Sequence, residues 1–416
     1  MSTPVMQPSP ASSQIRINAA LDAIQALEPQ IGAFCAFDAG RATGLMPRQG
    51  PLSGVTLGVK DIIDTKDFPT SYGSSIYAGW RPCADAACVT LLERAGAVSL
   101  GKTVTTEFAF FRPGKTRNPH DLRRTPGGSS SGSAAAVSCG MVSLGLASQT
   151  AASLTRPASY CGIAGLKPSF GSYGLAGIKG LAPSFDTLGT LAVDVATLAA
   201  AHNALGGGVA RAATRPARIG FCRTPWWHQG DAGMHQALEQ AATLLGAQTQ
   251  LEELALDEFT EGEALHKLIM SYEAAQALAF EFDHHEAQLS PQIAGLIKAG
   301  MAIPREDYLT ARGQAARLRR RANALFDKYD ILLAPAAPGE APLGLEGTGD
   351  PVFSRLWTLL RLPSLTLPGL QGPGGLPIGV QLLGARGADE QLLGFGSWAE
   401  TLLPARPIPA IAARSF

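Results

Sequence analysis

Charged side chains are scarce in this sequence, and neither sign is in excess. The 416 residues carry 34 basic and 34 acidic side chains, so only 16% of the chain is charged and the formal net charge is zero. Soluble domains usually carry about 25% charged residues. Because duplex binding requires a basic surface, nucleic acid is not expected as a partner. The 46% hydrophobic content excludes a disordered chain and indicates a large buried core.

Closely spaced cysteines and long apolar runs are also missing. The six cysteines form no CxxC pair and do not cluster with histidines, which argues against a zinc site and a disulfide scaffold. We expect reduced, mostly buried thiols, with no metal and no cofactor. The N-terminus lacks the basic and apolar segments of a signal peptide. The longest apolar run, 134–147, is too short for a membrane helix. These absences predict a cytoplasmic protein that does not enter a membrane.

The order of apolar segments predicts an α/β protein. Residues 1–13 are rich in serine and proline and are expected to form a flexible tail, whereas 14–30 show helical spacing. A strand–helix–strand rhythm follows and returns near the C-terminus. Its expected strands are 54–64, 98–102, 218–222, 331–339 and 377–384, and its expected helices include 88–97 and 390–403. We predict one α/β domain over 14–416, with a helix-rich insertion at about 231–330.

A glycine- and serine-rich loop at 126–133 opens onto an apolar segment that we expect to be helical. Such a loop can bind phosphate through its backbone amides, but the Lys-Ser/Thr ending of a Walker loop is absent. It also fits the nucleophile-elbow pattern G-x-S-x-G with Ser130 at its centre, although a polar segment and not a buried strand precedes it. A flexible turn is the third interpretation. That interpretation leaves a second unusual segment, 148–158, unexplained.

Together, the two segments resemble the amidase signature of the Ser-cisSer-Lys amidohydrolases. The segment 127–158 carries serines 24 residues apart, Ser129 and Ser153, and a Gly-Val-Lys-Asp segment at 58–61 supplies a lysine. The resemblance spans about residues 15–400. Its further motifs lie at 101–109, 117–128, 165–171, 184–189, 362–368 and 375–384, and a closer likeness to the malonamidases rests on 59–65, 77–80, 159–162 and 348–359.

The resemblance implies a fold and a catalytic apparatus. The fold would be a single α/β/α sandwich around a large mixed β-sheet. Ser153 would attack the amide carbonyl, Ser129 in a cis peptide would relay the proton, and Lys60 would act as the base. The residues themselves support the last role, because apolar neighbours desolvate a lysine and lower its pKa. The implied oxyanion hole consists of the backbone N–H groups of Thr150, Ala151, Ala152 and Ser153.

The substrate is expected to be a small amide that bears a carboxylate. Arg156 follows the expected nucleophile by three residues and precedes Pro157, so an arginine fixed there could bind a carboxylate bidentately. Ser130 is expected either to join the substrate-binding network or to cap the helix beginning near Ser133. The expected reaction releases ammonia from a malonamate-like molecule through an acyl-enzyme, in a homodimer. The alternatives are hydrolysis of a carboxylated urea derivative, an impaired binding homologue and a glutaminase-type amidotransferase subunit.

Two departures from the family pattern lie beside the expected nucleophile. Ala151 and Ala152 replace two glycines, which would strain the loop if either position required a positive φ angle. Gln149 stands where many family members carry aspartate. We expect these changes to affect catalytic activity and not the fold.

Overall fold

The computed structural model describes residues 10–40 and 48–413, which form one eleven-stranded sheet with helices around it. The strand order is β1-β3-β2-β4-β6-β5-β10-β11-β9-β7-β8. Strands β2–β3, β2–β4, β7–β8 and β7–β9 pair in parallel and the other pairs are antiparallel, so the sheet is mixed, as predicted. The strands are β1 (Phe34–Phe37), β2 (Thr56–Lys60), β3 (Val98–Thr103), β4 (Leu144–Gln149), β5 (Ala164–Lys167), β6 (Thr187–Ala192), β7 (Arg218–Cys222), β8 (Gln250–Leu254), β9 (Ile331–Pro335), β10 (Ser364–Gln371) and β11 (Pro377–Leu383).

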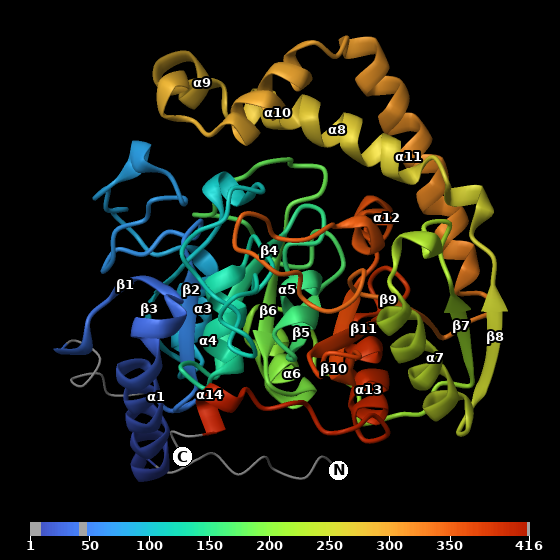
Figure 1. The fold of residues 1–416 in the computed structure, drawn as a ribbon, viewed down its shortest axis with the longest axis horizontal. Helices are drawn as coiled ribbons and strands as arrows, with labels where there is room; N and C mark the ends of the chain where they lie inside the picture. The colour runs from blue at the N-terminus through green and yellow to red at the C-terminus, as the bar shows by residue number, and fades with distance from the viewer. Residues whose placement is uncertain (1–9, 41–47, 414–416) are drawn as a thin grey trace.

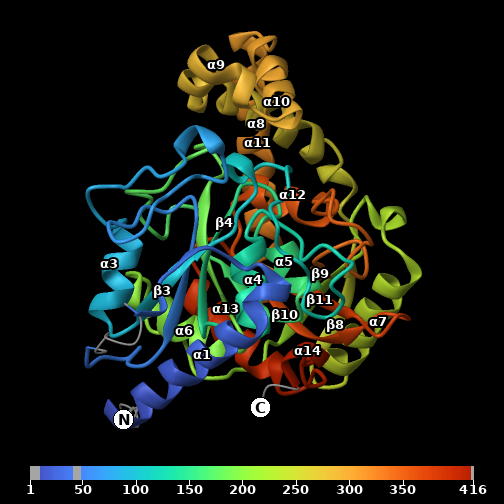
Figure 2. The same ribbon diagram turned by 60° about the vertical axis from the view of Figure 1, so that its left-hand side comes forward.

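Helices cover both faces of the sheet and one of its ends (Figures 1 and 2). Helices α4 and α5 pack on one face, α3, α6 and α13 pack on the other, and α7 packs against β8, β9, β10 and β11. Helices α8 to α11 form a layer across the end of the sheet, with α8 packed against α10, α11 and α12. The described helices are α1 (Pro10–Ile31), α3 (Ala87–Arg94), α4 (Ser131–Ser138), α5 (Thr155–Tyr160), α6 (Val195–Ala204), α7 (Ala232–Gly246), α8 (Gly262–Ala277), α9 (Ala279–His285), α10 (Pro291–Met301), α11 (Arg305–Leu325), α12 (Val352–Leu360), α13 (Asp389–Glu400) and α14 (Ala410–Ala413).

The structure corrects two expectations about element boundaries and adds detail to a third. Helix α1 begins at Pro10, so residues 10–13 do not belong to a tail, and 1–9 lie outside the described residues. The region 231–330, expected to be helix-rich, contains α7 to α11 and also supplies the edge strand β8. The apolar run 134–147 is not one helix: α4 ends at Ser138 and the buried strand β4 follows. Ala and Gly pack well in either element, so hydrophobic periodicity alone could not separate them.

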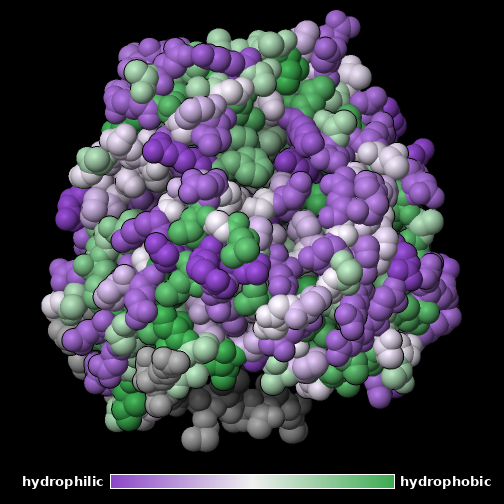
Figure 3. All heavy atoms as spheres, in the orientation of Figure 1, coloured by the Kyte–Doolittle hydropathy of each residue, from purple (hydrophilic) through white to green (hydrophobic). Residues whose placement is uncertain are grey.

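The outer surface mixes polar and apolar side chains. On the face drawn in Figure 3, hydrophilic residues alternate with small groups of hydrophobic ones. The described part of the chain contains no helix that is both long and apolar enough to span a membrane. All six cysteines are free thiols, four of them buried, in agreement with the expected reduced state.

Helix α4 lies unusually close to its neighbours because its residues are small. All eight of its residues are buried. A Cβ atom on Gly132 would lie 2.2 Å from the Ala33 carbonyl oxygen and 2.3 Å from the Val104 amide nitrogen. Both of these are backbone atoms, which cannot move aside as a flexible side chain can. Helix α4 therefore requires glycine at this position, directly after the loop that carries Ser129.

We predict that Gly132→Ala destabilises the protein, because over-packing a core costs about 1–3 kcal/mol or more. Gly295→Ala on α10 is the matched control, since nothing lies within 4 Å of a Cβ there and alanine favours a helix by about 1 kcal/mol. Thermal unfolding monitored by circular dichroism should show a lower Tm for Gly132→Ala and an unchanged or higher Tm for Gly295→Ala. Equal Tm values for the two variants would contradict the close packing of α4.

Candidate active site

Lys60 ends strand β2 and is completely buried. Its Nζ atom lies 2.7 Å from Ser129 Oγ and 2.8 Å from Ser148 Oγ, so the structure brings Lys60 and Ser129 together as predicted. Burial lowers the pKa of Lys60 to about 7, and the negative charge of Asp186 partly opposes this shift. A substantial fraction of Lys60 is therefore neutral near pH 7, which is the form that accepts a proton.

Ser148 was missed by the sequence analysis. It lies near the end of β4, which runs parallel to β2 with Val59 beside Leu146. That register places the end of β4 beside the end of β2, where Lys60 lies. Recognising β4 as a buried strand would have indicated Ser148, because parallel strands end at the same edge of a sheet.

Two other lysines are buried, and their surroundings differ from those of Lys60. Lys102 forms an ion pair with Asp61 at 3.2 Å, and Lys167 donates to the carbonyl oxygens of Pro168 and Leu362. Burial lowers the pKa of both lysines, that of Lys167 to about 8. Carbonyl oxygens can only accept hydrogen bonds. Both partners of Lys60 are hydroxyls, which can also donate a proton to it.

The loop that presents Ser129 is held by Arg156. The Gly128–Ser129 peptide bond is cis, as the family resemblance implied. Arg156 donates from Nη2 to the Gly128 carbonyl oxygen and to Thr348 Oγ1, at 2.7 and 2.9 Å. Its Nη1 atom donates to the Gly349 carbonyl oxygen at 2.7 Å. The guanidinium thus joins the Ser129 loop to the segment that precedes α12.

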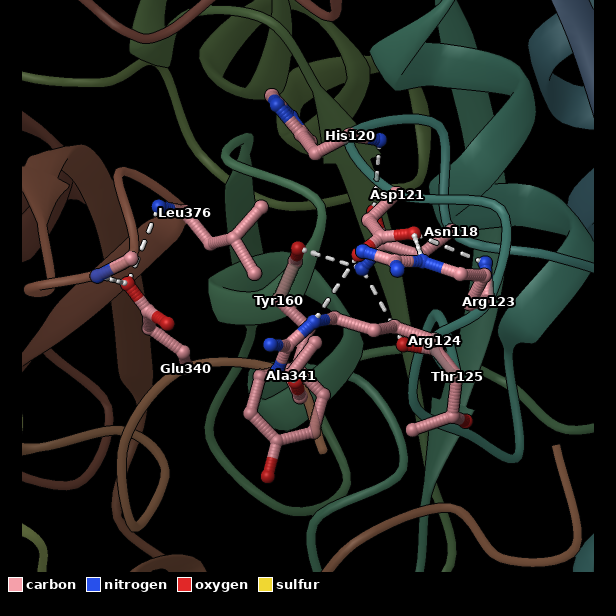
Figure 4. Close-up of polar contacts among 11 residues, drawn as sticks. Asn118, His120, Asp121, Arg123, Arg124, Thr125, Tyr160, Glu340, Ala341 and Leu376 are labelled. Atoms are coloured by element: carbon pink, nitrogen blue, oxygen red, sulfur yellow. Dashed lines mark hydrogen bonds and ion pairs between the residues drawn. The ribbon is translucent and has the colours of Figure 1, made fainter. Parts of the chain in front are cut away.

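The segment before this loop is fixed by polar contacts (Figure 4). Asn118 donates from Nδ2 to the carbonyl oxygens of Thr125 and Tyr160, at 3.2 and 2.9 Å. His120 Nε2 lies 3.1 Å from the Cys161 carbonyl oxygen, and burial lowers the pKa of His120 to about 4, so its ring is neutral and donates there. These contacts attach 118–125 to the end of α5. The segment is structural and leads the chain to Gly128 in a fixed position.

Residues 150–154 connect the buried strand β4 to α5, and Ser153 lies in this connection. Gln149 Oε1 accepts from the backbone N–H groups of Leu154 and Thr155, at 3.0 and 3.1 Å, and from Thr155 Oγ1. Gln149 Nε2 donates to Thr358 Oγ1, which donates to the Ala151 carbonyl oxygen at 2.8 Å. Gln149 therefore holds the 150–154 loop through both ends of its side-chain amide. These contacts explain why glutamine is compatible with the site where many family members carry aspartate.

The alanines that replace the usual glycines introduce no backbone strain. Five non-glycine residues in the described chain have a positive φ angle, and neither Ala151 nor Ala152 is among them. Both therefore adopt conformations that any L-residue accepts. The backbone strain that a positive φ angle at Ala151 or Ala152 would cause is therefore absent from this loop.

Four successive backbone N–H groups of this loop are free to bind a ligand. Within the described residues, the amides of Thr150, Ala151, Ala152 and Ser153 donate to no protein acceptor. Buried backbone N–H groups are almost always paired in folded proteins. All four residues line a cavity of about 360 Å³ together with Ser129, Arg156 and Arg355. These are the four amides for which the resemblance implied an oxyanion hole.

Asp186 and His266 position this loop from two sides, and neither was singled out as a site residue. Thr150 donates from Oγ1 to Asp186 Oδ1 at 2.6 Å, and burial raises the pKa of Asp186 to about 6. His266 Nε2 lies 2.8 Å from the Thr150 carbonyl oxygen. Both contacts come from residues distant in sequence from the loop; Asp186 lies in the 184–189 motif, whereas no local pattern indicated His266.

Ser130 makes hydrogen bonds within the site network, as expected, but does not cap α4 with its side chain. It is completely buried and is not among the residues that line the cavity. It occupies the position before α4, which begins at Ser131, but its side chain makes no capping hydrogen bond. Its Oγ atom instead contacts the backbone of Ser148, accepting from the amide and donating to the carbonyl, each at 3.4 Å. Ser130 thus connects the Ser129 loop to the end of β4.

A metal site is not apparent in the part of the chain that the structure describes. No three His, Cys, Asp or Glu side chains there are grouped so that they could hold an ion. The acid–base chemistry that the described site offers is that of Lys60 and its hydroxyl partners.

Comparison with known proteins shows similarity over nearly the whole chain. The Amidase family model matches residues 16–393. A glutamyl-tRNA(Gln) amidotransferase subunit of Anaeromyxobacter sp. (strain K) is 33% identical, over 92% of this chain and 91% of that protein. A crystal structure of an amidase superposes with a TM-score of 0.86 at 28% identity, covering 94% of this chain and 96% of that one. Peptide amidase from Stenotrophomonas maltophilia gives 0.80 at 28% identity, with coverages of 96% and 95%.

The titration of Lys60 leads to a prediction about pH dependence. Because Lys60 accepts a proton only when neutral, kcat/KM should rise as the pH increases through about 7 and level off above it. Measuring ammonia release between about pH 5 and pH 9 tests this. A profile without a rising limb near neutrality would contradict the assignment of Lys60 as the base.

Asp186→Asn should move the rising limb to lower pH, because it removes the negative charge that raises the pKa of Lys60. An asparagine can still accept from the Leu181 and Ala182 amides and contact Thr150. Asp194→Asn at the start of α6 is the control, since asparagine caps a helix as well as aspartate. An Asp186→Asn profile that coincides with the wild-type profile would show that Asp186 does not influence Lys60.

Proposed function

Because the chain belongs to the amidase family of amide-hydrolysing enzymes, we propose that it hydrolyses a small amide through Ser153, Ser129 and Lys60 and releases ammonia. The observation that carries this proposal is a buried lysine in contact with Ser129, which lines the same cavity as the residues of the four unpaired backbone amides. An amide is a poor electrophile, so its hydrolysis requires an activated nucleophile, a proton donor and oxyanion stabilisation. The site supplies a group for each requirement.

In the proposed reaction, neutral Lys60 accepts the Ser129 proton while Ser129 accepts the proton of Ser153. Ser153 Oγ then bonds to the amide carbon, and the resulting oxyanion binds the N–H groups of 150–153. Ser129 next donates a proton to the leaving nitrogen and regains one from the Lys60 ammonium, the carbonyl re-forms as the C–N bond breaks, and ammonia departs. Water attacks the acyl-enzyme by the same proton path, which regenerates Ser153 and releases the carboxylic acid.

The charge in the cavity favours an anionic substrate. Arg156 and Arg355 are the charged side chains among the residues that line it, and neither forms an ion pair with a carboxylate of the described chain. Buried charges are normally paired. A carboxylate on the substrate would compensate for this positive charge, as in malonamate. A carboxylated urea derivative has the same chemistry and fits the same argument.

A glutaminase-type subunit is the second candidate, because several similar proteins are subunits of glutamyl-tRNA(Gln) amidotransferases. Glutamine carries an α-ammonium group besides its carboxylate, and this ammonium requires an acceptor. The residues that line the described cavity include no Asp or Glu. This composition favours a substrate without an ammonium group. We expect the free chain, or its homodimer, to act without a second protein.

The test is ammonia release from malonamate by the purified chain alone, without ATP. Ser153→Ala should abolish turnover and labelling by a fluorophosphonate probe, because it removes the nucleophile. Ser143→Ala is the matched control, since Ser143 precedes β4 at the end opposite Gln149 and its hydroxyl contacts Thr56. Labelling that persists in Ser153→Ala, or turnover that requires a second protein, would overturn the proposal.

A further inference from the structure

We propose that Arg355 binds the substrate carboxylate and determines specificity, whereas Arg156 is a positioning residue. The inference rests on the proposed function and identifies the group that selects the substrate. It also revises the sequence-based expectation, which assigned the carboxylate to Arg156. The two arginines differ in the hydrogen bonds that they make.

The Nη donors of Arg156 are engaged by the protein, although its buried Nε atom, like that of Arg355, has no partner among the described residues. A guanidinium binds a carboxylate bidentately through two N–H groups that point the same way, and each such pair in arginine includes an Nη2 hydrogen. Both Nη2 hydrogens of Arg156 are donated, one to Gly128 and one to Thr348. Releasing them would detach Arg156 from the loop that carries Ser129. Arg156 therefore holds the loop and has no bidentate pair left for a ligand.

The donors of Arg355 are almost entirely unused. Arg355 lies on α12 and is 6% exposed, yet no carboxylate oxygen of the described residues lies within 4 Å of its guanidinium. Its buried Nε atom has no hydrogen-bond partner among these residues, and its Nη1 atom makes one long contact of 3.4 Å with His266 Nδ1. Burial lowers the pKa of Arg355, although Glu263 and Asp350 act from a distance to raise it. Arginine nevertheless remains charged.

His266 orients Arg355 without neutralising it. Because His266 Nε2 faces the Thr150 carbonyl oxygen, it must donate there, which leaves Nδ1 as an acceptor for Arg355. Burial and the charge of Arg355 lower the pKa of His266 to about 3, so the ring is neutral. The ring also stacks on Phe185 with 4.5 Å between centroids. Arg355 is therefore fixed by a neutral group and keeps its full charge for a ligand.

The positive charge of Arg355 lies in the cavity where the substrate is proposed to bind. Arg355 lines the same cavity as Ser153, and the cavity wall also includes the apolar side chains of Phe110, Phe111 and Met270. Apolar walls exclude water and strengthen the attraction between a guanidinium and a carboxylate. The class of substrate is a short amide that carries a carboxylate.

The experiment compares Arg355→Met and Arg156→Met on two substrates of matched shape, malonamate and its neutral methyl ester. Losing a buried contact between an arginine and a carboxylate should lower kcat/KM for malonamate by about 100-fold or more in Arg355→Met, and the ester should change by less than about 3-fold. Arg156→Met should lower kcat/KM for both substrates, because it releases the Ser129 loop. Arg312→Ala removes an exposed arginine of α11 and should change neither substrate.

Equal losses on both substrates in Arg355→Met would overturn the inference, and so would a loss confined to malonamate in Arg156→Met. If the wild-type protein hydrolyses neither substrate, the proposed function fails and malonate binding measured by calorimetry tests the inference instead. Malonate affinity should then fall by about 100-fold in Arg355→Met. Unchanged affinity in that variant would refute the role of Arg355.

Discussion

The site depends on the burial of one lysine. Removing the Lys60 ammonium group from water disfavours its charge and lowers its pKa to about 7. Two other lysines are buried as well, but one is paired with a carboxylate and the other contacts carbonyl oxygens. Only a neutral lysine beside a hydroxyl can activate that hydroxyl. The parallel pairing of β2 with β4 and the small residues of α4 bring these groups together.

Helix α12 connects substrate recognition to the proposed catalytic groups. Its Ser354 contacts Thr155, its Thr358 contacts Ala151 and its Arg355 lines the cavity. His266 then links Arg355 to the loop that bears the free amides. One helix thus holds the loop of Ser153 and presents the charge that we propose selects the substrate. Because α12 contacts both the Ser153 loop and the cavity, it keeps the substrate and the nucleophile in a fixed relative position.

The sequence predicted those features of the fold and site that depend on local residue patterns. The α/β class followed from alternating apolar segments, and the proximity of Lys60 to Ser129 followed from motif resemblance. The strand β4 was not separated from α4, because both are built from small apolar residues. Ser148, His266 and Arg355 were missed because their importance arises from contacts across the sheet and the helical layer. Arg156 was expected to bind the substrate carboxylate because it follows Ser153 by three residues. This spacing does not reveal that both Nη2 hydrogens of Arg156 are donated to other protein groups.

The most direct measurement of the central claim is an NMR titration of Lys60 itself. The chain contains nine lysines, so the Cε signals of protein labelled with ¹³C-lysine can be assigned by Lys-to-Arg substitution. We predict that the Lys60 signal titrates with a midpoint of about 7, well below the value of about 10.4 for a lysine in water. A Lys60 signal that remains in the protonated position up to about pH 10 would contradict it.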